Sequence, residues 1–475
     1  MKLRAIFFMV LALAGGAIAV DRVSPAKPAA RSTVSLAPAA GVLSCPYVTE
    51  PGAGAYMQLA NIGSTTASVR LGIAAAKGSP IAISLNVPAG STTALRVPAT
   101  AASRAAAVIE YSGGPIIATH MLFLPPSSGP VVRAGGAAAS PCARAGGQDI
   151  VVTGARTLGT DVNLALYNPG SADADVSISL IADGRVLQPQ RLTKRIVPSH
   201  ARLDFRLGDF AFSARNVTAV VHAISGRIVA EGLLRSTQGV EFLPGQTPAN
   251  EMVAVAGQSG SGANVGVTVI GQDDAGLDVR LITAGAQASI PGFPPSLPPA
   301  GGRYLGIPDQ GKGSAAAYVF GVTVGSPIVA GTSWITTQSG AQEQAVLPGV
   351  VPSSQWGAVL GAFPPGATTR ALIVNPGSAP SLVHVTTFGP SGQSAQDVSV
   401  PAGRLVDVSV GKGVGTFAVF VDADAPVVLA LRSVALAAGN QATSVAIAGE
   451  SFAAATPEAV VIDPRAGVPA ALPTP

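Results

Sequence analysis

The stretch LYNPGSADADVSISL (residues 166–180) reads as a strand, a tight turn and a second strand, and a near copy, LIVNPGSAPSLVHVTTF, begins at residue 372. The two turns consist of Asn168, Pro169 and Gly170 and of Asn375, Pro376 and Gly377. Asn before Pro-Gly predicts an Asx-type turn followed by a glycine that can take positive φ. We therefore expect a turn kept for folding, while its use as a binding loop stays open.

Further copies show that the hairpin belongs to a repeat of about one hundred residues. The hairpin turn recurs at Asn61, Asn168, Asp273 and Asn375, with spacings of 107, 105 and 102 residues. A Pro-containing turn follows at Val87, Val197, Pro298 and Val400, and a strand opening follows at Pro115, Arg227, Pro327 and Pro426. Because the landmarks keep one order, they predict four repeats, at 44–137, 138–246, 247–349 and 350–450.

Apolar runs within each repeat predict the fold class. In the fourth repeat, six runs of 4 to 8 residues are separated by turn residues, and none has a helical period. A hundred residues with about seven short strands are typical of a β-sandwich, whereas a propeller blade would repeat near 45 residues. We expect an all-β chain of four tandem immunoglobulin-like β-sandwich repeats after an N-terminal signal segment. FLPP at Phe123, FLPG at Phe242 and VLPG at Val346 would close the first three repeats.

The N-terminus predicts export. Lys2 and Arg4 precede an apolar run, and Ala17 and Ala19 match a small-x-small cleavage site. Residues 1–20 are therefore expected to form a signal peptide or, if uncleaved, a signal anchor. A Pro/Ala-rich linker (21–43) follows it, and a Pro/Ala-rich tail (451–475) ends the chain. The expected location is extracytoplasmic, secreted or anchored to the outer face of the cytoplasmic membrane only through that segment.

Charge gives little support to a nucleic-acid partner. The net charge is +4, but the basic residues are scattered and are not interleaved with aromatic residues. Nucleic-acid surfaces need clustered positive charge, so we expect no such partner.

Cys45 and Cys142, the only two cysteines, bracket the first repeat. In an exported chain they predict a disulfide, worth roughly 4 kcal/mol in the chain-entropy model. Two free thiols are the alternative. A metal site is not expected, because no histidine or further cysteine lies nearby at ligand spacing. The Gly- and Ala-rich residues 135–147 are expected to form a bendable linker.

No set of residues predicts catalysis, a cofactor or a resident metal. The histidines are dispersed and are expected to be structural or exposed: His120, His200, His222 and His384. The acidic pairs offer too few oxygens for a strong Ca²⁺ site, although a weak one stays open: Asp273 with Asp274 and Asp422 with Asp424. Trp334 and Trp356 flank a repeat junction and are expected to pack there rather than against sugar.

Several of these motifs together resemble a known family. They are Cys-Pro at Cys45, the cysteine opening the next repeat, the NPGS hairpins, the VPAG turns and the closing AVFVDADAPVVLALR. The chain is similar to uncharacterised extracytoplasmic proteins of Actinobacteria of the domain of unknown function 5719 type. The resemblance implies an envelope protein with an N-terminal signal or anchor, and it carries no catalytic residues.

These patterns lead to one functional expectation with two alternatives. We expect a non-enzymatic, exported cell-envelope scaffold or binding protein, whose partner is a protein or a cell-wall polysaccharide. One alternative is a dedicated glycan-binding module. The other is an envelope-polymer hydrolase, which would place His222 or His384 beside a buried aspartate and a serine.

Overall fold

Antiparallel strands make up nearly all of the regular structure, as the turn-separated apolar runs predict. The computed structural model describes residues 39–75, 81–98, 104–126, 135–260, 262–290, 292–310, 314–338, 341–362, 367–436 and 442–452. Within these ranges the only helices are the single 3₁₀ turns η1 (Gln190–Leu192) and η2 (Leu207–Asp209). The all-β prediction is confirmed.

The first eight strands form two sheets that share one core, and we call them sheet pair 1. The sheet orders are β1-β6-β3-β4 and β5-β2-β7-β8. Side chains of both sheets meet in one apolar cluster, with Leu71 and Ile109 from one and Leu59 and Leu122 from the other. The strands are β1 (Gly41–Thr49), β2 (Gly54–Asn61), β3 (Ala67–Ala75), β4 (Ile81–Val87), β5 (Ser91–Arg96), β6 (Ala105–Ser112), β7 (Ile116–Leu124) and β8 (Gly136–Pro141).

Sheet pair 2 has the same plan, with its two sheets joined through β9 and β17 into one path, β12-β11-β15-β9-β17-β16-β10-β14, and with β13 beside β11. Its strands are β9 (Asp149–Ala155), β10 (Asp161–Tyr167), β11 (Ala174–Ala182), β12 (Arg185–Leu187), β13 (Arg195–Val197), β14 (Arg202–Arg206), β15 (Val217–Ala223), β16 (Val229–Arg235) and β17 (Val240–Gln246).

Sheet pair 3 consists of β18-β24-β20-β21, with β22 beside β20, and of β23-β19-β25-β26. Its strands are β18 (Glu251–Ala256), β19 (Ala263–Val269), β20 (Ala275–Ile282), β21 (Gln287–Ser289), β22 (Ser296–Leu297), β23 (Gly302–Gly306), β24 (Ala316–Gly325), β25 (Ile328–Gln338) and β26 (Ala341–Pro348).

Sheet pair 4 is joined by one long strand, β32, which pairs with β27 and β29 in its first half and with β28 and β33 in its second. Its strands are β27 (Ser353–Ala362), β28 (Thr368–Asn375), β29 (Ser381–Gly389), β30 (Gly392–Val400), β31 (Arg404–Lys412), β32 (Gly415–Leu436), β33 (Ala442–Ala448) and β34 (Glu450–Ser451).

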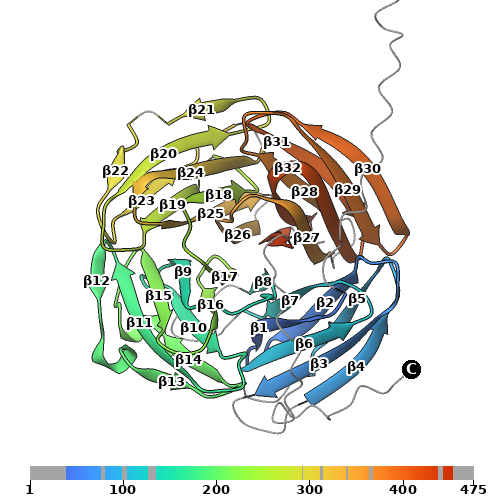
Figure 1. Cartoon of the computed structure of the whole chain (residues 1–475), viewed down its shortest axis with the longest axis horizontal. Coiled ribbons are helices and arrows are strands. Elements are labelled where there is room, and N and C mark those ends of the chain that lie inside the picture. Colours follow the sequence, from blue (N-terminus) through green and yellow to red (C-terminus); the bar gives the residue numbers. More distant parts are fainter. Residues whose placement is uncertain are drawn as a thin grey trace, which may run out of the picture. The chain divides into compact units, whose positions relative to one another are not determined.

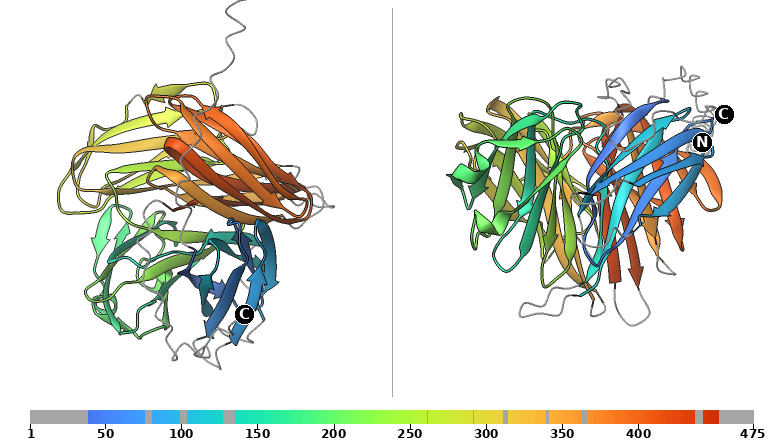
Figure 2. Two further views of the ribbon diagram at one scale, coloured as in Figure 1. Left: turned by 45° about the vertical axis from the view of Figure 1, so that its right-hand side comes forward. Right: turned by 90° about the horizontal axis from the view of Figure 1, so that it is seen from below.

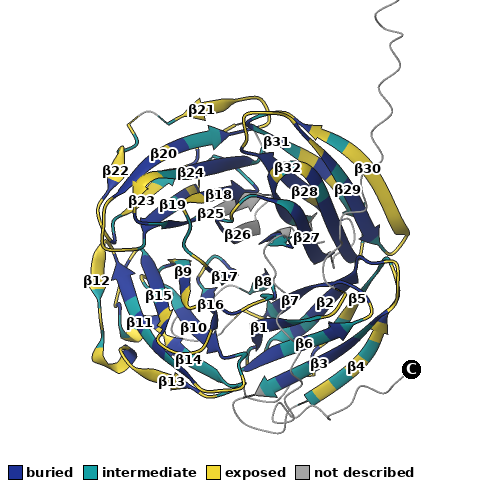
Figure 3. Cartoon of the chain, viewed as in Figure 1, coloured by how far each residue is buried: buried dark blue, intermediate teal, exposed yellow. Residues whose placement is uncertain are grey.

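One strand order therefore recurs when β12 with β13 and β21 with β22 are each counted as one broken fourth strand, and the two halves of β32 as sixth and seventh strands. In each pair the first strand neighbours the sixth, then the third and fourth, while the second lies between the fifth and seventh. Fourth-place strands, such as β4 and β30, lie on the outside and are largely exposed (Figure 3). First- and last-place strands, such as β8 and β27, lie toward the middle (Figure 1). Their near-continuous burial reflects contacts on both faces.

Two sequence landmarks fall elsewhere than predicted. Phe123 lies in β7, the seventh strand, whereas Phe242 and Val346 lie in eighth-place strands. Residues 136–141 form the eighth strand of pair 1. Just after it, Ala143 forms a β-bridge with Ser44 of β1. The expected linker at 135–147 is therefore part of a sheet, because its Ala-rich run fits a buried position between neighbouring strands.

The sheet pairs contact one another in a ring (Figures 1 and 2). Arg202 of pair 2 donates to the Ala105 carbonyl of pair 1, Val346 of pair 3 joins the core of pair 2, and pairs 3 and 4 share one apolar cluster. Pair 4 returns to pair 1 where the Gly361 amide donates to Gln58. All these residues belong to one compact unit, Ala37–Pro475.

Some predictions lie outside the described residues: the signal segment with Ala17 and Ala19, the linker up to residue 38, and the tail from residue 453. Within the described part, no helix is long and apolar enough to cross a membrane.

Candidate functional site

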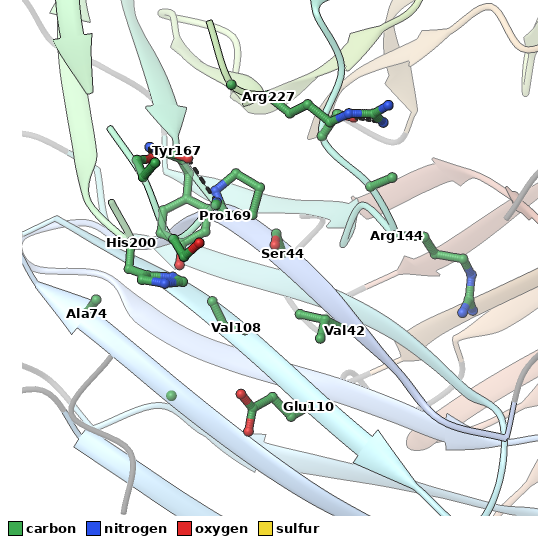
Figure 4. Close-up of a pocket in the computed structure, with 18 of the residues that line it drawn as sticks. Val42, Ser44, Ala74, Val108, Glu110, Arg144, Tyr167, Pro169, His200 and Arg227 are labelled. Carbon is green, nitrogen blue, oxygen red and sulfur yellow. Dashed lines mark hydrogen bonds between the residues drawn. The ribbon is translucent and has the colours of Figure 1, made fainter. Parts of the chain in front are cut away.

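A cavity of about 630 Å³ lies where sheet pair 1 meets the hairpin turn of sheet pair 2 (Figure 4), and we call it the junction cavity. Its floor consists of small side chains from neighbouring strands, including Gly72 and Ala74 of β3 and Val108 of β6. The turn of residues 167–172 and the segment 144–146 form its walls. Small residues on the face opposite the core leave the space that larger side chains would fill.

An ion pair lies at the base of the junction cavity. Arg70 and Glu110 stand opposite each other on β3 and β6, and their charged atoms are 3.6 Å apart. The Arg70 side chain is 3% exposed and that of Glu110 is 14% exposed. Burial raises the pKa of the Glu110 carboxyl above its ordinary value, against the opposing charges of Arg70 and His200.

Two further guanidinium groups line the same cavity. Arg144 donates to the Tyr111 hydroxyl and to the Ile116 carbonyl, each at 2.8 Å, and its Nε lies 2.8 Å from a carboxylate oxygen of Glu450. Arg227 is exposed and donates to the Gly146 carbonyl at 3.3 Å. Arg144 is thus held rigidly, whereas Arg227 can reorient toward a ligand.

Tyr167 and His200 complete the lining from sheet pair 2 (Figure 4). Burial raises the pKa of the Tyr167 hydroxyl far above its ordinary value, with the Glu110 charge adding to the effect, so the phenol stays neutral. His200 has a φ of 54°, in the left-handed region. The cavity therefore combines Arg70, Arg227 and the Glu110 carboxyl over a floor of small residues, while the Arg144 head group is directed toward Tyr111, Ile116 and Glu450.

The predicted turn residues make one shared set of hydrogen bonds. The Nδ2 of Asn168 donates to the carbonyls of Ala172 and Val197, and its Oδ1 accepts from the Gly170 amide. Asn61 and Asn375 repeat this pattern within their own sheet pairs. All three asparagines are fully buried, so each amide links the hairpin turn to the Pro-containing turn. Asn168, Pro169 and Gly170 also line the junction cavity.

The third sheet pair departs from this pattern. Val269, not Asp273, occupies the position of the buried asparagine. The backbone amide of Val269 donates to the Gly301 carbonyl, just as the backbone amide of Asn168 donates to the Ala201 carbonyl in sheet pair 2. The landmark at Asp273 was therefore misplaced by four residues. The residues GQDDAG resemble the hairpin turn of the other copies, and this resemblance gives the wrong alignment of the third repeat.

The turn that contains a residue with positive φ is also different from the one expected. Gly377 and Gly170 do not have positive φ. The left-handed residue lies in the Pro-containing turn, at Gly90, His200, Ala300 and Gly403, with φ of 61°, 54°, 55° and 59°. The expectation of a positive φ at Gly377 is wrong, because the Asx hydrogen bond closes that turn.

Cys45 and Cys142 form the predicted disulfide. The fold brings His120 to it, with Nδ1 3.7 Å from Sγ of Cys142, although His120 is distant from Cys45 in sequence. The Nε2 of His120 lies 3.0 Å from a carboxylate oxygen of Glu231, and both side chains are buried. Sequence spacing could not reveal this cluster, because its members come from β1, β7, β16 and the residue after β8.

The other histidines remain apart from this cluster. His222 contacts Asp149 and His384 contacts Asp397, each at 2.7 Å, and all four side chains are exposed. The hydrolase alternative requires a histidine beside a buried aspartate, but Asp149 and Asp397 are both exposed.

The acidic pairs and tryptophans also have structural contacts. Asp424 accepts hydrogen bonds from the Ser381 hydroxyl and the Leu382 amide, while Asp422 accepts one from Gln355. Among the described residues, the only metal-ligand-type group of three is Cys45, His120 and Cys142. Trp334 and Trp356 are buried within the core shared by pairs 3 and 4.

Sequence reasoning did not single out Arg70, Glu110 and Arg144 as site residues. A signal was present in SVRLGIA, where Val69, Leu71 and Ile73 face the core and the opposite face carries an arginine followed by Gly and Ala. An arginine beside small residues, on the strand face opposite the core, predicts that another part of the chain covers that face. Which turn covers it depends on contacts between sheet pairs, and these have no local sequence pattern.

Comparisons with solved structures give only weak likenesses. Thermotoga maritima 1070 is 14% identical, with a TM-score of 0.19, covering 22% of this chain and 97% of that one. The serine-rich repeat protein Srr2 from Streptococcus agalactiae is 9% identical, with a TM-score of 0.12, covering 74% of this chain and 90% of that one. A glycoside hydrolase family 32 structure from Bifidobacterium adolescentis is 11% identical, with a TM-score of 0.13, covering 86% and 96%. At these scores none bears on fold or function.

No curated protein matches the chain. A family model described as "Family of unknown function (DUF5719)" matches residues 45–181 and 127–294, which together span more than half of the sequence. The family predicted from the hairpin, turn and cysteine motifs is confirmed. The chain belongs to this DUF5719 family of unknown function.

Proposed function

We propose that this chain is a non-enzymatic, exported cell-envelope scaffold that binds its partner in the junction cavity, and that its sheet pairs are four tandem immunoglobulin-like sandwiches. The observation that carries the proposal is the set of charged groups in that cavity. Arg70, Glu110, Arg144 and Arg227 gather there above a floor of small apolar residues. The recurring strand order supports the sandwich assignment.

The cavity chemistry favours a ligand with a negative group on an apolar body. Guanidinium groups bind carboxylate and phosphate through paired hydrogen bonds, and Arg227 has donors available toward solvent. Tyr167 is the only tyrosine, phenylalanine or tryptophan among the described residues that line the cavity, and its ring is buried. The cavity therefore lacks the flat exposed aromatic platform of a neutral sugar site. We therefore favour an acidic segment of an envelope protein over a neutral wall polysaccharide.

Export is part of the same proposal. The N-terminal signal pattern supports it, and so does the buried disulfide, since such bonds persist in oxidising compartments outside the cytoplasm. The hydrolase alternative has less support, because both described histidine–aspartate pairs are exposed.

Affinity capture from intact envelopes tests the proposal. Tagged wild-type protein is compared with Arg227→Ala, which removes a cavity guanidinium, and with Arg185→Ala, which removes an exposed arginine of β12 away from the cavity. We expect one enriched partner whose affinity falls about tenfold with Arg227→Ala and stays unchanged with Arg185→Ala. Equal capture by all three proteins would overturn the assignment to this cavity. The mature N-terminus, read in the same experiment, reports whether residues 1–20 are removed.

A further inference from the structure

The buried cluster around the disulfide has the composition of a metal site. Sγ of Cys45, Sγ of Cys142 and a ring nitrogen of His120 all lie within 4.8 Å of one another. Two thiolates and one imidazole are a frequent ligand set for Zn²⁺ in proteins. All three residues are 0% exposed, and they are fixed by β1, β7 and the start of the segment after β8.

One ring nitrogen of His120 lies beside the disulfide. Nε2 lies 3.0 Å from a carboxylate oxygen of Glu231 on the far side of the ring. Nδ1 faces Sγ of Cys142 at 3.7 Å. Tetrahedral zinc with its usual bond lengths separates neighbouring sulfur and nitrogen ligands by about 3.5 Å. Little movement is then needed between these two atoms.

Glu231 supplies the outer partner that metal-binding histidines commonly have. A carboxylate bound to the far nitrogen orients the ring and increases its basicity toward a metal. The Glu231 side chain is 3% exposed, and the Phe242 ring packs edge-on against the imidazole with centroids 4.6 Å apart. The imidazole is therefore enclosed by the Glu231 carboxylate on one side and the Phe242 ring on another.

A second cavity lies next to the cluster. This central cavity, of about 670 Å³, is lined by residues of all four sheet pairs, and Ser140, Cys142 and Glu231 are among them. Opening of this lining by a small movement would connect the cavity to Cys142, which is 0% exposed in the oxidised chain.

We propose that the reduced chain binds a single soft divalent cation, of the Zn²⁺ class, through Cys45, Cys142 and His120, and that disulfide formation expels it. Reduction by a dithiol gives two electrons and two protons to the Cys45–Cys142 bond, and the dithiol becomes a disulfide. Binding of the cation then displaces both thiol protons. Oxidation by any two-electron acceptor reforms the sulfur–sulfur bond and releases the cation.

Cobalt titration of the full chain tests the inference, because thiolate ligands give Co²⁺ an intense charge-transfer band. We expect reduced wild-type protein to bind one equivalent with this band and with the visible spectrum of tetrahedral Co²⁺, and Zn²⁺ to displace it. Oxidised protein should show no band. His120→Ala should weaken binding at least tenfold, and Glu231→Gln should weaken it about 10- to 100-fold while the thiolate band persists.

His222→Ala is the matched control, since it removes an exposed histidine paired to an aspartate and should leave the titration unchanged. A reduced wild-type chain without a thiolate band would overturn the inference. So would equal affinity in His120→Ala, because a reduced chain that had lost its fold would bind through the two thiols alone. Protection of both thiols from alkylation by Zn²⁺, dependent on His120, provides a second readout in the same variants.

Discussion

The side-chain carbonyl of Gln58 accepts a hydrogen bond of 2.8 Å from the backbone amide of Gly361, 303 residues further along the chain. Gln58 lies in β2 of sheet pair 1 and Gly361 in β27 of sheet pair 4, and both are buried. The contact joins the first sheet pair to the last. An apolar cluster beside it includes Ile62 and Ile117 of pair 1 and Phe420 of pair 4.

Replacing Gln58 should destabilise the whole chain. Gln58→Met keeps the side-chain volume but leaves the Gly361 amide without its acceptor, and an unpaired buried amide costs about 1 to 3 kcal/mol. We expect the free energy of unfolding in urea to fall by that amount. Gln396→Met, in the exposed part of β30, is the control. Equal losses of stability in the two variants would contradict a stabilising contact between Gln58 and Gly361.

Loss of a buried turn asparagine should be costly because three hydrogen bonds go with it. For Asn375→Ala we expect a loss of about 2 to 4 kcal/mol in the free energy of unfolding. The comparison is Asn264→Ala, an exposed strand position, where the change should stay within about 0.5 kcal/mol. If both variants unfold at the same urea concentration, the buried amide contributes nothing.

Ala300 is a site where glycine should stabilise the protein. At a φ of 55° a non-glycine residue costs about 1 to 2 kcal/mol, and part of the relief is lost to the greater freedom of glycine in the unfolded chain. We therefore expect Ala300→Gly to raise the free energy of unfolding by about 0.5 to 1 kcal/mol. Ala402→Gly, one residue before the left-handed Gly403, should lower it, and stabilisation by both changes would contradict the assignment.

Glu450 should make stability fall as pH rises. Burial raises its pKa from 4.5 to about 7, although the Arg144 charge opposes the shift. Below pH 4.5 the carboxyl is protonated in both the folded and unfolded chains. Between pH 4.5 and 7 the unfolded chain releases its proton first, so the free energy of unfolding falls by about 2 to 3 kcal/mol from this group.

The Glu450→Gln variant isolates that contribution. Its free energy of unfolding, measured from pH 4 to 8, should lack the decline that wild type shows between pH 4.5 and 7. Glu251→Gln, at an exposed position, should follow the wild-type profile. Parallel profiles for wild type and Glu450→Gln would show that this carboxyl ionises at its ordinary pKa.

The sequence predicted the parts of the fold that depend on local patterns. Alternating burial along β29 and the Asx bonds of Asn168 and Asn375 follow from residue type and spacing alone. The register of the third pair was harder to predict, because Val269 fills the asparagine position and only backbone hydrogen bonds reveal it. His200 takes the left-handed position that Gly90 and Gly403 occupy in their own turns, as the alignment of the Pro-containing turns indicates.

The candidate sites could not be predicted in the same way, because both depend on distant contacts. Arg144 meets Glu450 at the far end of the chain, and His120 meets Glu231 of the next sheet pair. The expectation of no metal site rests on ligand spacing in the sequence. Spacing rules describe ligands on one short loop, whereas these three residues come from β1, β7 and the residue after β8.

Hydrogen exchange at the Gly361 amide tests the closed ring most directly. Selective glycine labelling resolves this amide by NMR, and the amide donates to the Gln58 side chain. We expect slow exchange in the wild-type protein and fast exchange in Gln58→Met, with Gly357 of the same strand remaining slow in both. Fast exchange at Gly361 in the wild-type protein would show that the first and fourth sheet pairs do not close on each other.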